Sequence, residues 1–216
     1  MPASRLVILG AGGHAVSAYN VALSAGFDVT QFVDPGLRGG KVLGTDIVGD
    51  LSEVADAGNL QTFIAIGDND SRCRVHSDVS AQYPGMSFPR LIHSSAVVSY
   101  HASIGEGTIL MPGSVVGPNT AIGRFCILNT RSAIDHDGVM GDCSSLAPGV
   151  TTGGKVRIGL RSAISIGAVI KHDITIGDDC VVGANSYVNA NLPGNCIAYG
   201  TPARIVRPRT RTDRYL

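Results

Sequence analysis

A repeat of six residues is the feature that most constrains how this chain can fold. Reading every sixth residue from Ile92 to Val188 gives an aliphatic side chain at every step except Thr152. Glycine often follows that aliphatic residue, as at Gly105, and small residues such as Ala102 recur four places after it. An α-helix repeats every 3.6 residues and a simple strand every two, so neither produces this pattern. The second half of the chain is therefore a repeat architecture.

Each six-residue unit is interpreted as one short flat strand followed by a corner, so that three units make a triangular coil of 18 residues. The aliphatic residue points inward and stacks on its equivalent one coil away, and stability comes from stacking neighbouring coils. The small residue is expected where inward space is tightest, and the glycine after the aliphatic residue is expected to relieve the backbone at the turn. The general preference for right-handed crossovers does not settle the hand of such a coil.

The first 90 residues instead alternate between strands and helices, which predicts a parallel sheet in a truncated Rossmann-like unit. Strands are expected at 5–9, 29–33, 62–66 and 87–91, and helices from His14 to about Ala25, near 51–57 and over 71–83. We expect an N-terminal domain at 1–91 and a repeat domain at 92–206, packed rigidly because no flexible linker joins them. The Arg-rich tail at 207–216 is expected to be frayed or to contact another subunit.

Composition excludes several function classes. Lys and Arg together number 17, as do Asp and Glu, so the chain lacks the basic excess of a nucleic-acid or anionic-membrane binder. No apolar run approaches the roughly 20 residues that span a bilayer, and the start shows no signal-peptide pattern. The five cysteines show no CxxC spacing, which argues against structural zinc or disulfides and for a reducing cytoplasm. The histidines form no ligand set, so no metal is expected.

Glycine-rich residues 10–14 follow the first strand as a degenerate form of the dinucleotide-binding fingerprint. Free amides of Gly12 and Gly13 at the start of a helix suit an anion, although a tight turn is the alternative explanation. Asp34 follows the second strand, where a ribose-binding acid is usually found. Asp68 and Asn69 end the third strand at the same edge and are candidates to complete this pocket, although an ordinary turn explains them equally well.

These motifs are followed by Asn129-Thr130 and Asp135-His136-Asp137 within the repeats, and by residues 200–204 (GTPAR) at their end. Together they resemble the bacterial sugar acyltransferases of the sialic acid O-acetyltransferase type, which include N-acetyltransferases of nucleotide-linked 4-amino sugars. The resemblance covers about residues 4 to 206. It implies a left-handed parallel β-helix and a homotrimer with active sites at clefts between neighbouring β-helices. Acetyl-CoA would lie along each cleft.

The resemblance assigns the N-terminal motif to a sugar nucleotide and not to NAD. It implies that Gly12, Gly13, His14, Asp34 and Pro35 contact the substrate, with Asp68, Asn69 and Asn129 nearby. Asn129 follows an inward aliphatic residue, and because asparagine tolerates a left-handed backbone, a turn role is the alternative.

His136 is the strongest catalytic candidate. Residue 134 points inward, so His136 is expected at a corner, where it can face a cleft between subunits. An imidazole with an ordinary pKa near 6.5 accepts a proton at neutral pH, here from the sugar amine or hydroxyl that attacks the thioester. The family pattern favours Asp137 as the carboxylate that orients the ring, although Asp135 also flanks it and adjacent residues on extended chain point to opposite sides. An ordinary surface histidine is the alternative.

For acetyl-CoA, the resemblance points to Ser145, Gly154, Ile166 and Ala184, with Arg204 a phosphate partner near the adenine end. Small and apolar residues at 154, 166 and 184 equally suit plain β-helix geometry. Many family members carry a second histidine nine residues after the catalytic one, where this chain has Ser145. A serine hydroxyl can still donate to the thioester region, but it cannot carry positive charge.

The predicted function is therefore acetyl-CoA-dependent N-acetylation of a nucleotide-linked 4-amino-4,6-dideoxy sugar. O-acetylation of sialic acid or a related sugar uses the same base chemistry and remains an alternative. An NAD-dependent oxidoreductase is disfavoured because the first 90 residues offer no obvious acid for hydride transfer. A non-catalytic or zinc-binding β-helix is disfavoured because a trimeric zinc site needs three well-placed histidines.

Overall fold

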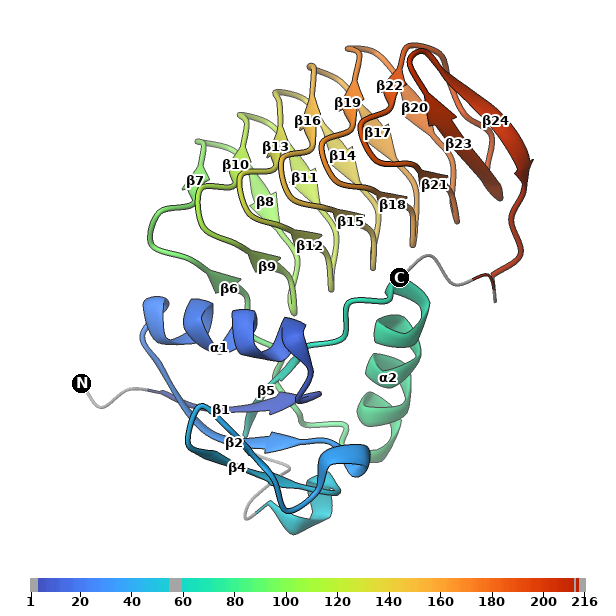
Figure 1. The fold of residues 1–216 in the computed structure, drawn as a ribbon. Helices are drawn as coiled ribbons and strands as arrows, with labels where there is room; N and C mark the ends of the chain where they lie inside the picture. Colours follow the sequence, from blue (N-terminus) through green and yellow to red (C-terminus); the bar gives the residue numbers. More distant parts are fainter. Residues whose placement is uncertain (1–3, 55–59, 212, 214–216) are drawn as a thin grey trace.

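The computed structural model describes residues 4–54, 60–211 and 213. An N-terminal α/β unit lies beneath a long three-sided column of short strands (Figure 1). The sheet of the N-terminal unit has the strand order β3-β4-β2-β1-β5, and all its neighbours are parallel except β3 and β4. Its strands are β1 (Ser4–Leu9), β2 (Phe27–Val33), β3 (Lys41–Val42), β4 (Thr45–Val48) and β5 (Gln61–Ile64).

The helices of this unit are α1 (Gly13–Ser24), α2 (Asn69–Gln82) and the 3₁₀ turns η1 (Pro35–Leu37) and η2 (Leu51–Glu53). The helix expected near 51–57 is therefore a single 3₁₀ turn as far as it is described, since residues 55–59 lie outside the described residues. Of the strand expected at 87–91, Ser87 makes a single bridge with Gln61, and Leu91 begins the first strand of the column. Pro89 has no N–H to continue a ladder there. The hairpin of β3 and β4 was not predicted because its strands are too short to show a pattern.

The column has three faces, each a sheet of stacked two-residue strands. The first face contains β6 (Leu91–Ile92), β9 (Ile109–Leu110), β12 (Ile127–Leu128), β15 (Ser145–Leu146), β18 (Ala163–Ile164), β21 (Val181–Val182), β23 (Cys196–Gly200) and β24 (Ala203–Pro208). The second face contains β7 (Val97–Val98), β10 (Val115–Val116), β13 (Ala133–Ile134), β16 (Thr151–Thr152), β19 (Val169–Ile170) and β22 (Tyr187–Val188). The third face contains β8 (Ser103–Ile104), β11 (Ala121–Ile122), β14 (Val139–Met140), β17 (Arg157–Ile158) and β20 (Thr175–Ile176).

From β6 to β23, each strand pairs in parallel with the strand one coil away, as Val116 does with Ile134, whereas β24 pairs antiparallel with β23. The inward aliphatic residues stack into one continuous core, and residues such as Leu128 and Leu146 are completely buried. The predicted α/β unit followed by a left-handed parallel β-helix is confirmed. From Thr108 onward, the small residues four places after the inward aliphatic residues are buried as expected, whereas Ala96 and Ala102 in the first coil are only partly buried. Hydroxyls such as that of Thr120 donate to a corner carbonyl, here Asp135 O at 2.7 Å.

The glycines after the inward residues do not have the role that was expected of them. Gly105 does not have a positive φ, and a Cβ built on it would stand 2.5 Å from the carbonyl carbon of Gly123 in the next coil. These glycines therefore permit close stacking of coils. The left-handed backbone occurs two residues later, as at Gly107 and Asn119, where φ is 63° and 58°.

The first face of the column rests on the N-terminal unit. Leu91, Ile109 and Ile127 point outward from it and are buried in one cluster with α1 residues such as Ala15 and Ala18. This shared apolar core fixes the two halves against each other, and it determines where the cavities described below can form.

The tail is not frayed where the structure describes it. Arg209 is 4% exposed and donates to Asp179 O at 3.0 Å, at the far end of the column. Arg211 then pairs with Asp70 on α2, so the tail connects the column back to the N-terminal unit. Of the two expectations for the tail, the frayed end does not describe Arg209 and Arg211, because carbonyls and carboxylates receive their donors.

Replacing Gly105 with alanine is expected to destabilise the column by about 2 to 3 kcal/mol, because the new Cβ must push apart two backbones. The matched variant is Gly113→Ala, at a left-handed corner where other coils already carry Asn119 or Arg131. It should cost only about 1 kcal/mol, the usual penalty for a left-handed alanine. Thermal unfolding followed by circular dichroism measures both, and equal melting midpoints would contradict the stacking explanation.

Candidate active site

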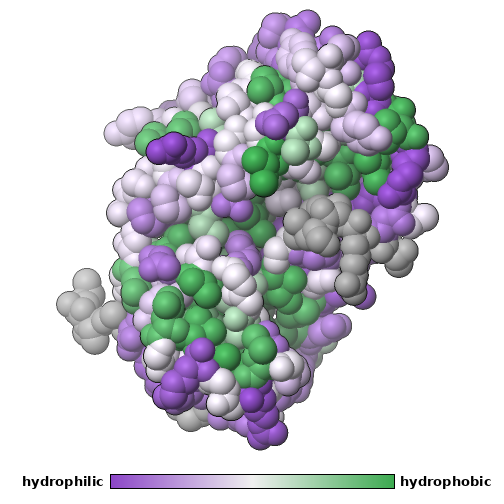
Figure 2. Space-filling view, viewed as in Figure 1, coloured by the Kyte–Doolittle hydropathy of each residue, from purple (hydrophilic) through white to green (hydrophobic). Residues whose placement is uncertain are grey.

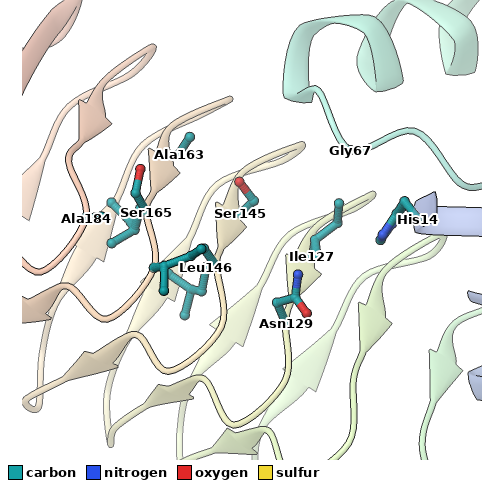
Figure 3. Close-up of a pocket in the computed structure, with 12 residues that line it drawn as sticks. His14, Gly67, Ile127, Asn129, Ser145, Leu146, Ala163, Ser165 and Ala184 are labelled. Carbon is teal, nitrogen blue, oxygen red and sulfur yellow. The ribbon is translucent and has the colours of Figure 1, made fainter. Parts of the chain in front are cut away.

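A cavity of about 300 Å³ lies between the N-terminal unit and the first face of the column. The space-filling view shows the surface hollowed between the two halves (Figure 2). The close-up shows side chains of both halves around the cavity (Figure 3). It exists because the outward side chain of the first face shrinks from Ile127 to Ser145 and Ala163 in successive coils. The lining residues are His14, Gly67, Ile127, Asn129, Ser145, Leu146, Ala147, Ala163, Ile164, Ser165, Ile166 and Ala184.

His14, the second residue of α1, contributes an imidazole to this cavity. Burial, together with the smaller effect of the Arg72 charge, lowers the pKa of His14 to about 4. The ring is therefore neutral at physiological pH. Its Nε2 is buried and has no hydrogen-bond partner among the described residues. A neutral ring nitrogen without a partner is available to a ligand.

Four of the side chains predicted to contact substrate or acetyl-CoA on the column also line the cavity: Asn129, Ser145, Ile166 and Ala184. Asn129 does not have the left-handed backbone that a turn role would need. That conformation falls on Arg131, with φ of 55°, because left-handed residues occur three places after the inward residue. The Asn129 Oδ1 accepts from the Thr130 N–H at 2.8 Å, which fixes its side chain at the rim.

A second cavity of about 370 Å³ lies at the carboxyl ends of β1 and β2, where sheets of this type commonly bind ligands. Asp34 and Pro35 line it. The Asp34 carboxylate accepts from Ala11 N and from Gly36 N, both at 3.0 Å, so it ties the glycine-rich loop to the end of β2. Beside it, a Cβ added to Gly12 or to Gly13 would meet no atom within 4 Å, which leaves the start of α1 open to a ligand.

The predicted contact of Asn69 with substrate is corrected by the structure. Asn69 is completely buried, and its Nδ2 donates to Arg161 O at 3.2 Å and Ser162 O at 3.1 Å in the column. Its side chain therefore faces the column and not the cavity. Asp68 is half-buried and caps α2 by accepting from Ser71 N at 2.8 Å. The neighbour that does line the cavity is Gly67.

His136 and Asp137 form a hydrogen-bonded dyad at the corner between the second and third faces. Nδ1 of His136 lies 2.7 Å from Oδ2 of Asp137, and both side chains are nearly half exposed, at 48% and 44%. Asp137 has a φ of 57°, and this left-handed turn brings its carboxylate back beside the ring. Asp135 instead accepts from the backbone N–H of His136 at 2.7 Å. Asp137 is therefore the carboxylate that orients the ring.

The dyad shifts both of its pKa values. The hydrogen bond to Asp137 raises the pKa of His136 above 6.5. The hydrogen bond from His136, and then that from Asn119, lowers the pKa of Asp137. Gly154 lies one coil away directly against the ring, and a Cβ there would stand 2.3 Å from Nε2 of His136. Only glycine leaves room for the ring in this position, so a residue expected to contact cofactor also shapes the dyad.

Within a single chain, the His136–Asp137 dyad does not lie at the cavity. The cavity lies on the first face and on the corner leading to the second, whereas the dyad lies on the next corner along the coil. Arg204 lies apart from both, exposed on β24, with Nη1 donating to Ala203 O.

Within residues 4–54, 60–211 and 213, no three His, Cys, Asp or Glu side chains gather closely enough to hold a metal ion. In that same part of the chain, neither helix is long and apolar enough to cross a membrane.

Gly154→Ala is expected to displace the His136 ring and weaken its bond to Asp137. The pKa of His136, measured by NMR, should then fall from above 6.5 back toward 6.5. Gly149→Ala, which adds a Cβ with nothing within 4 Å, is the control and should leave the titration unchanged. An unaltered His136 titration in a folded Gly154→Ala protein would show that this glycine does not control the dyad.

Comparison with known sequences matches the N-terminal unit to a family and about half of the chain to a curated relative. The family of PglD N-terminal domains matches residues 5–79. GDP-perosamine N-acetyltransferase of Escherichia coli O157:H7 is 31% identical over 106 residues, which are 49% of this chain and 48% of that protein. The alignment thus spans about half the length of this curated relative.

Similarity to solved structures extends over nearly the whole chain. PerB of Caulobacter crescentus, in complex with CoA and GDP-perosamine, is 36% identical with a TM-score of 0.87, covering 94% of this chain and 97% of that one. The acetyltransferase domain of PglB from Neisseria gonorrhoeae, in complex with acetyl coenzyme A, is 28% identical with a TM-score of 0.87, covering 94% and 100%. The chain therefore belongs to the hexapeptide-repeat family of sugar acetyltransferases that includes GDP-perosamine N-acetyltransferase and PglB.

Proposed function

We propose that this protein transfers the acetyl group of acetyl-CoA to the amino group of a GDP-linked 4-amino-4,6-dideoxy sugar. The His136–Asp137 pair at 2.7 Å is the observation that carries the proposal, because it supplies an oriented proton acceptor, with Gly154 of the next coil leaving room for the ring. The structural relative that the chain matches over 97% of its length was solved with CoA and GDP-perosamine. The product would be a building block for a bacterial polysaccharide or other glycan.

The proposed chemistry requires one proton acceptor. The amine nitrogen forms a bond to the thioester carbonyl carbon, the carbon–sulfur bond breaks, and the nitrogen loses a proton to Nε2 of His136. The proton then passes to the departing CoA sulfur. Asp137 holds the proton on Nδ1, so that Nε2 carries the free lone pair, and it stabilises the imidazolium that forms. Variants of the Caulobacter enzyme with one histidine replaced by asparagine or alanine were solved with both ligands, and we propose that His136 is the counterpart of that histidine.

The sugar nucleotide would be held mainly by the N-terminal unit. The open amides of Gly12 and Gly13 at the start of α1 suit a diphosphate. Asp34 and Pro35 line the adjacent cavity for the nucleoside. His14 offers a neutral nitrogen on the side facing the column, where Asn129 lies across the same cavity. Asp68 caps α2 beside this region, so it would lie next to the site without contacting the substrate.

Acetyl-CoA would run along the column past Ser145, Gly154, Ile166 and Ala184. Ile166 is 58% exposed, so its side chain is open to contact with pantetheine or with another subunit. Arg204, exposed on β24 near the end of the column, would pair with a CoA phosphate.

A homotrimer would complete the site. The second face of the column presents outward valines, of which Val97, Val115 and Val169 are 55%, 37% and 45% exposed. An apolar sheet face of this kind is normally covered. Pairing it with another column would bring the dyad of one copy toward the cavity of its neighbour, which a single chain keeps apart. Five free thiols fit a reducing cytoplasm as its location.

The first test is CoA release from acetyl-CoA with GDP-, UDP- and dTDP-linked 4-amino sugars and free sialic acid as acceptors. We expect turnover with the GDP-linked amine, and His136→Ala should lower it at least ~10²-fold, the contribution of a general base. His101→Asn, an exposed histidine at another left-handed corner, is the control and should keep full activity. Activity on sialic acid alone would replace N-acetylation with O-acetylation, and near-normal turnover of His136→Ala would remove the proposed base.

The pH dependence of kcat/KM follows from the dyad. Because catalysis needs neutral His136 and its pKa is raised, activity should be low at acid pH and rise to a plateau with an inflection above 6.5. Asp137→Asn removes the main cause of the shift, so its inflection should move down toward 6.5 while the plateau falls. An inflection that is the same in both proteins would mean that another group limits the rate.

A further inference from the structure

A completely buried arginine in the first turn of α2 forms hydrogen bonds to the column. Arg72 Nε donates to Phe125 O at 2.7 Å, and Nη2 donates to Cys143 O at 2.9 Å, both in the column. On the side of the N-terminal unit, Nη1 donates to Ile66 O at 2.8 Å and Gly67 O at 2.9 Å. One guanidinium therefore connects the loop after β5 to two coils of the column.

Asn69 extends the same contact to a third coil. Its Oδ1 accepts from Nη2 of Arg72 at 2.7 Å, and its Nδ2 donates to Arg161 O and Ser162 O. Asn69 and Arg72 thus act as one hydrogen-bonded unit. We call these two side chains the interdomain clamp.

The carbonyls that the clamp binds form a ladder. Phe125, Cys143 and Arg161 occupy the same left-handed corner position in successive coils, with φ of 53°, 58° and 54°. Their N–H groups bond to the preceding coil, as Cys143 N does to Arg124 O, whereas their carbonyls accept from the clamp. Buried carbonyls need donors, and the flat, forked guanidinium can supply several in fixed directions.

The clamp lies immediately next to the wall of the cavity. The corner carbonyls stand two residues before the outward side chains of the wall, which are Ile127, Ser145 and Ala163. On the opposite side, the clamp holds the carbonyl of Gly67, which lines the same cavity. The charge of Arg72 also acts on His14, the other N-terminal residue of the lining. Because Arg72 is fully buried, it acts on a ligand through the groups that it holds in place and not by direct contact.

We propose that Arg72, together with Asn69, is a positioning residue for the sugar nucleotide: it fixes the distance between the Gly67–His14 side of the cavity and the column wall. The proposal rests on the proposed function for the identity of the ligand. The column supplies the predicted acetyl-CoA contacts without the clamp, so the clamp should affect the two substrates differently.

Arg72→Met removes the donors and the charge while keeping the length of the side chain. We expect the KM for the GDP-linked amino sugar to rise at least about tenfold, since small misplacements in a site have effects of this size or larger. The KM for acetyl-CoA and kcat should stay within about threefold. Arg72→Lys should recover only part of the effect, because an ammonium cannot reproduce the fork. Arg74→Met, exposed on the same helix, is the matched control and should behave as the unmodified protein.

A second readout needs no substrate, so it separates failure of the clamp from failure of the proposed function. NMR titration of His14 should show a ring that stays neutral down to about pH 4 in the unmodified protein. The groups that face His14 are the Arg72 guanidinium, the uncharged Asn129 and Ser145 of the wall, and the Gly67 backbone. In Arg72→Met the pKa of His14 should rise toward 6.5, because the charge is lost and water enters the loosened cavity.

Several outcomes would overturn the proposal. A folded Arg72→Met protein with unchanged sugar-nucleotide KM and unchanged His14 titration would show that the clamp only stabilises the fold, even if its melting temperature falls. If Arg72→Met does not fold, the same measurements on Arg72→Lys and Asn69→Ala test the proposal. If both variants show the sugar-nucleotide KM and the His14 titration of the unmodified protein, the positioning role is rejected. If the unmodified protein acetylates no sugar, the proposed function fails while the His14 titration still tests the geometry.

Discussion

The structure depends on the close approach of successive coils in the column. Coils that stack this closely leave no space for a Cβ where Gly105 and Gly117 stand, and they require a left-handed residue at each corner. The register that results repeats every 18 residues, as Val115 pairs with Ala133. The same register positions the functional side chains. Gly154 lies against His136 because the two residues are one coil apart. The clamp binds carbonyls at equivalent positions of successive coils for the same reason.

Two histidines of the candidate site show how environment sets chemistry. His14 is half-buried with its Nε2 enclosed, and loss of solvent around the ring keeps it neutral with a pKa of about 4. His136 is exposed and bonded to Asp137, which favours the charged ring and raises its pKa. Burial disfavours a charge and an adjacent carboxylate stabilises it, so the same residue type offers a hydrogen-bonding group in one place and a proton acceptor in the other.

The repeat pattern was sufficient to predict the column, because each inward position is repeated many times and a single exception such as Thr152 does not obscure it. The pairing of His136 with a flanking carboxylate could also be predicted, since it is local. What the sequence could not show are contacts between the halves. Asn69 looks like a pocket residue at the end of a strand, and only the packing of α2 reveals that it faces the column. The role of each glycine could not be predicted either. A glycine is found both at a tight turn and where two backbones approach closely, so the sequence alone does not distinguish the two.

The last two strands have a consequence for how the molecule behaves at high concentration. A stack of parallel coils is a template onto which another chain could add further rungs, which is how fibres grow. At the C-terminal end of this column, β24 runs antiparallel to β23 and is followed by the buried Arg209. A second column arriving with parallel strands meets, on the first face, a strand that runs in the opposite direction. The hairpin of β23 and β24 therefore opposes end-to-end polymerisation of columns at that end.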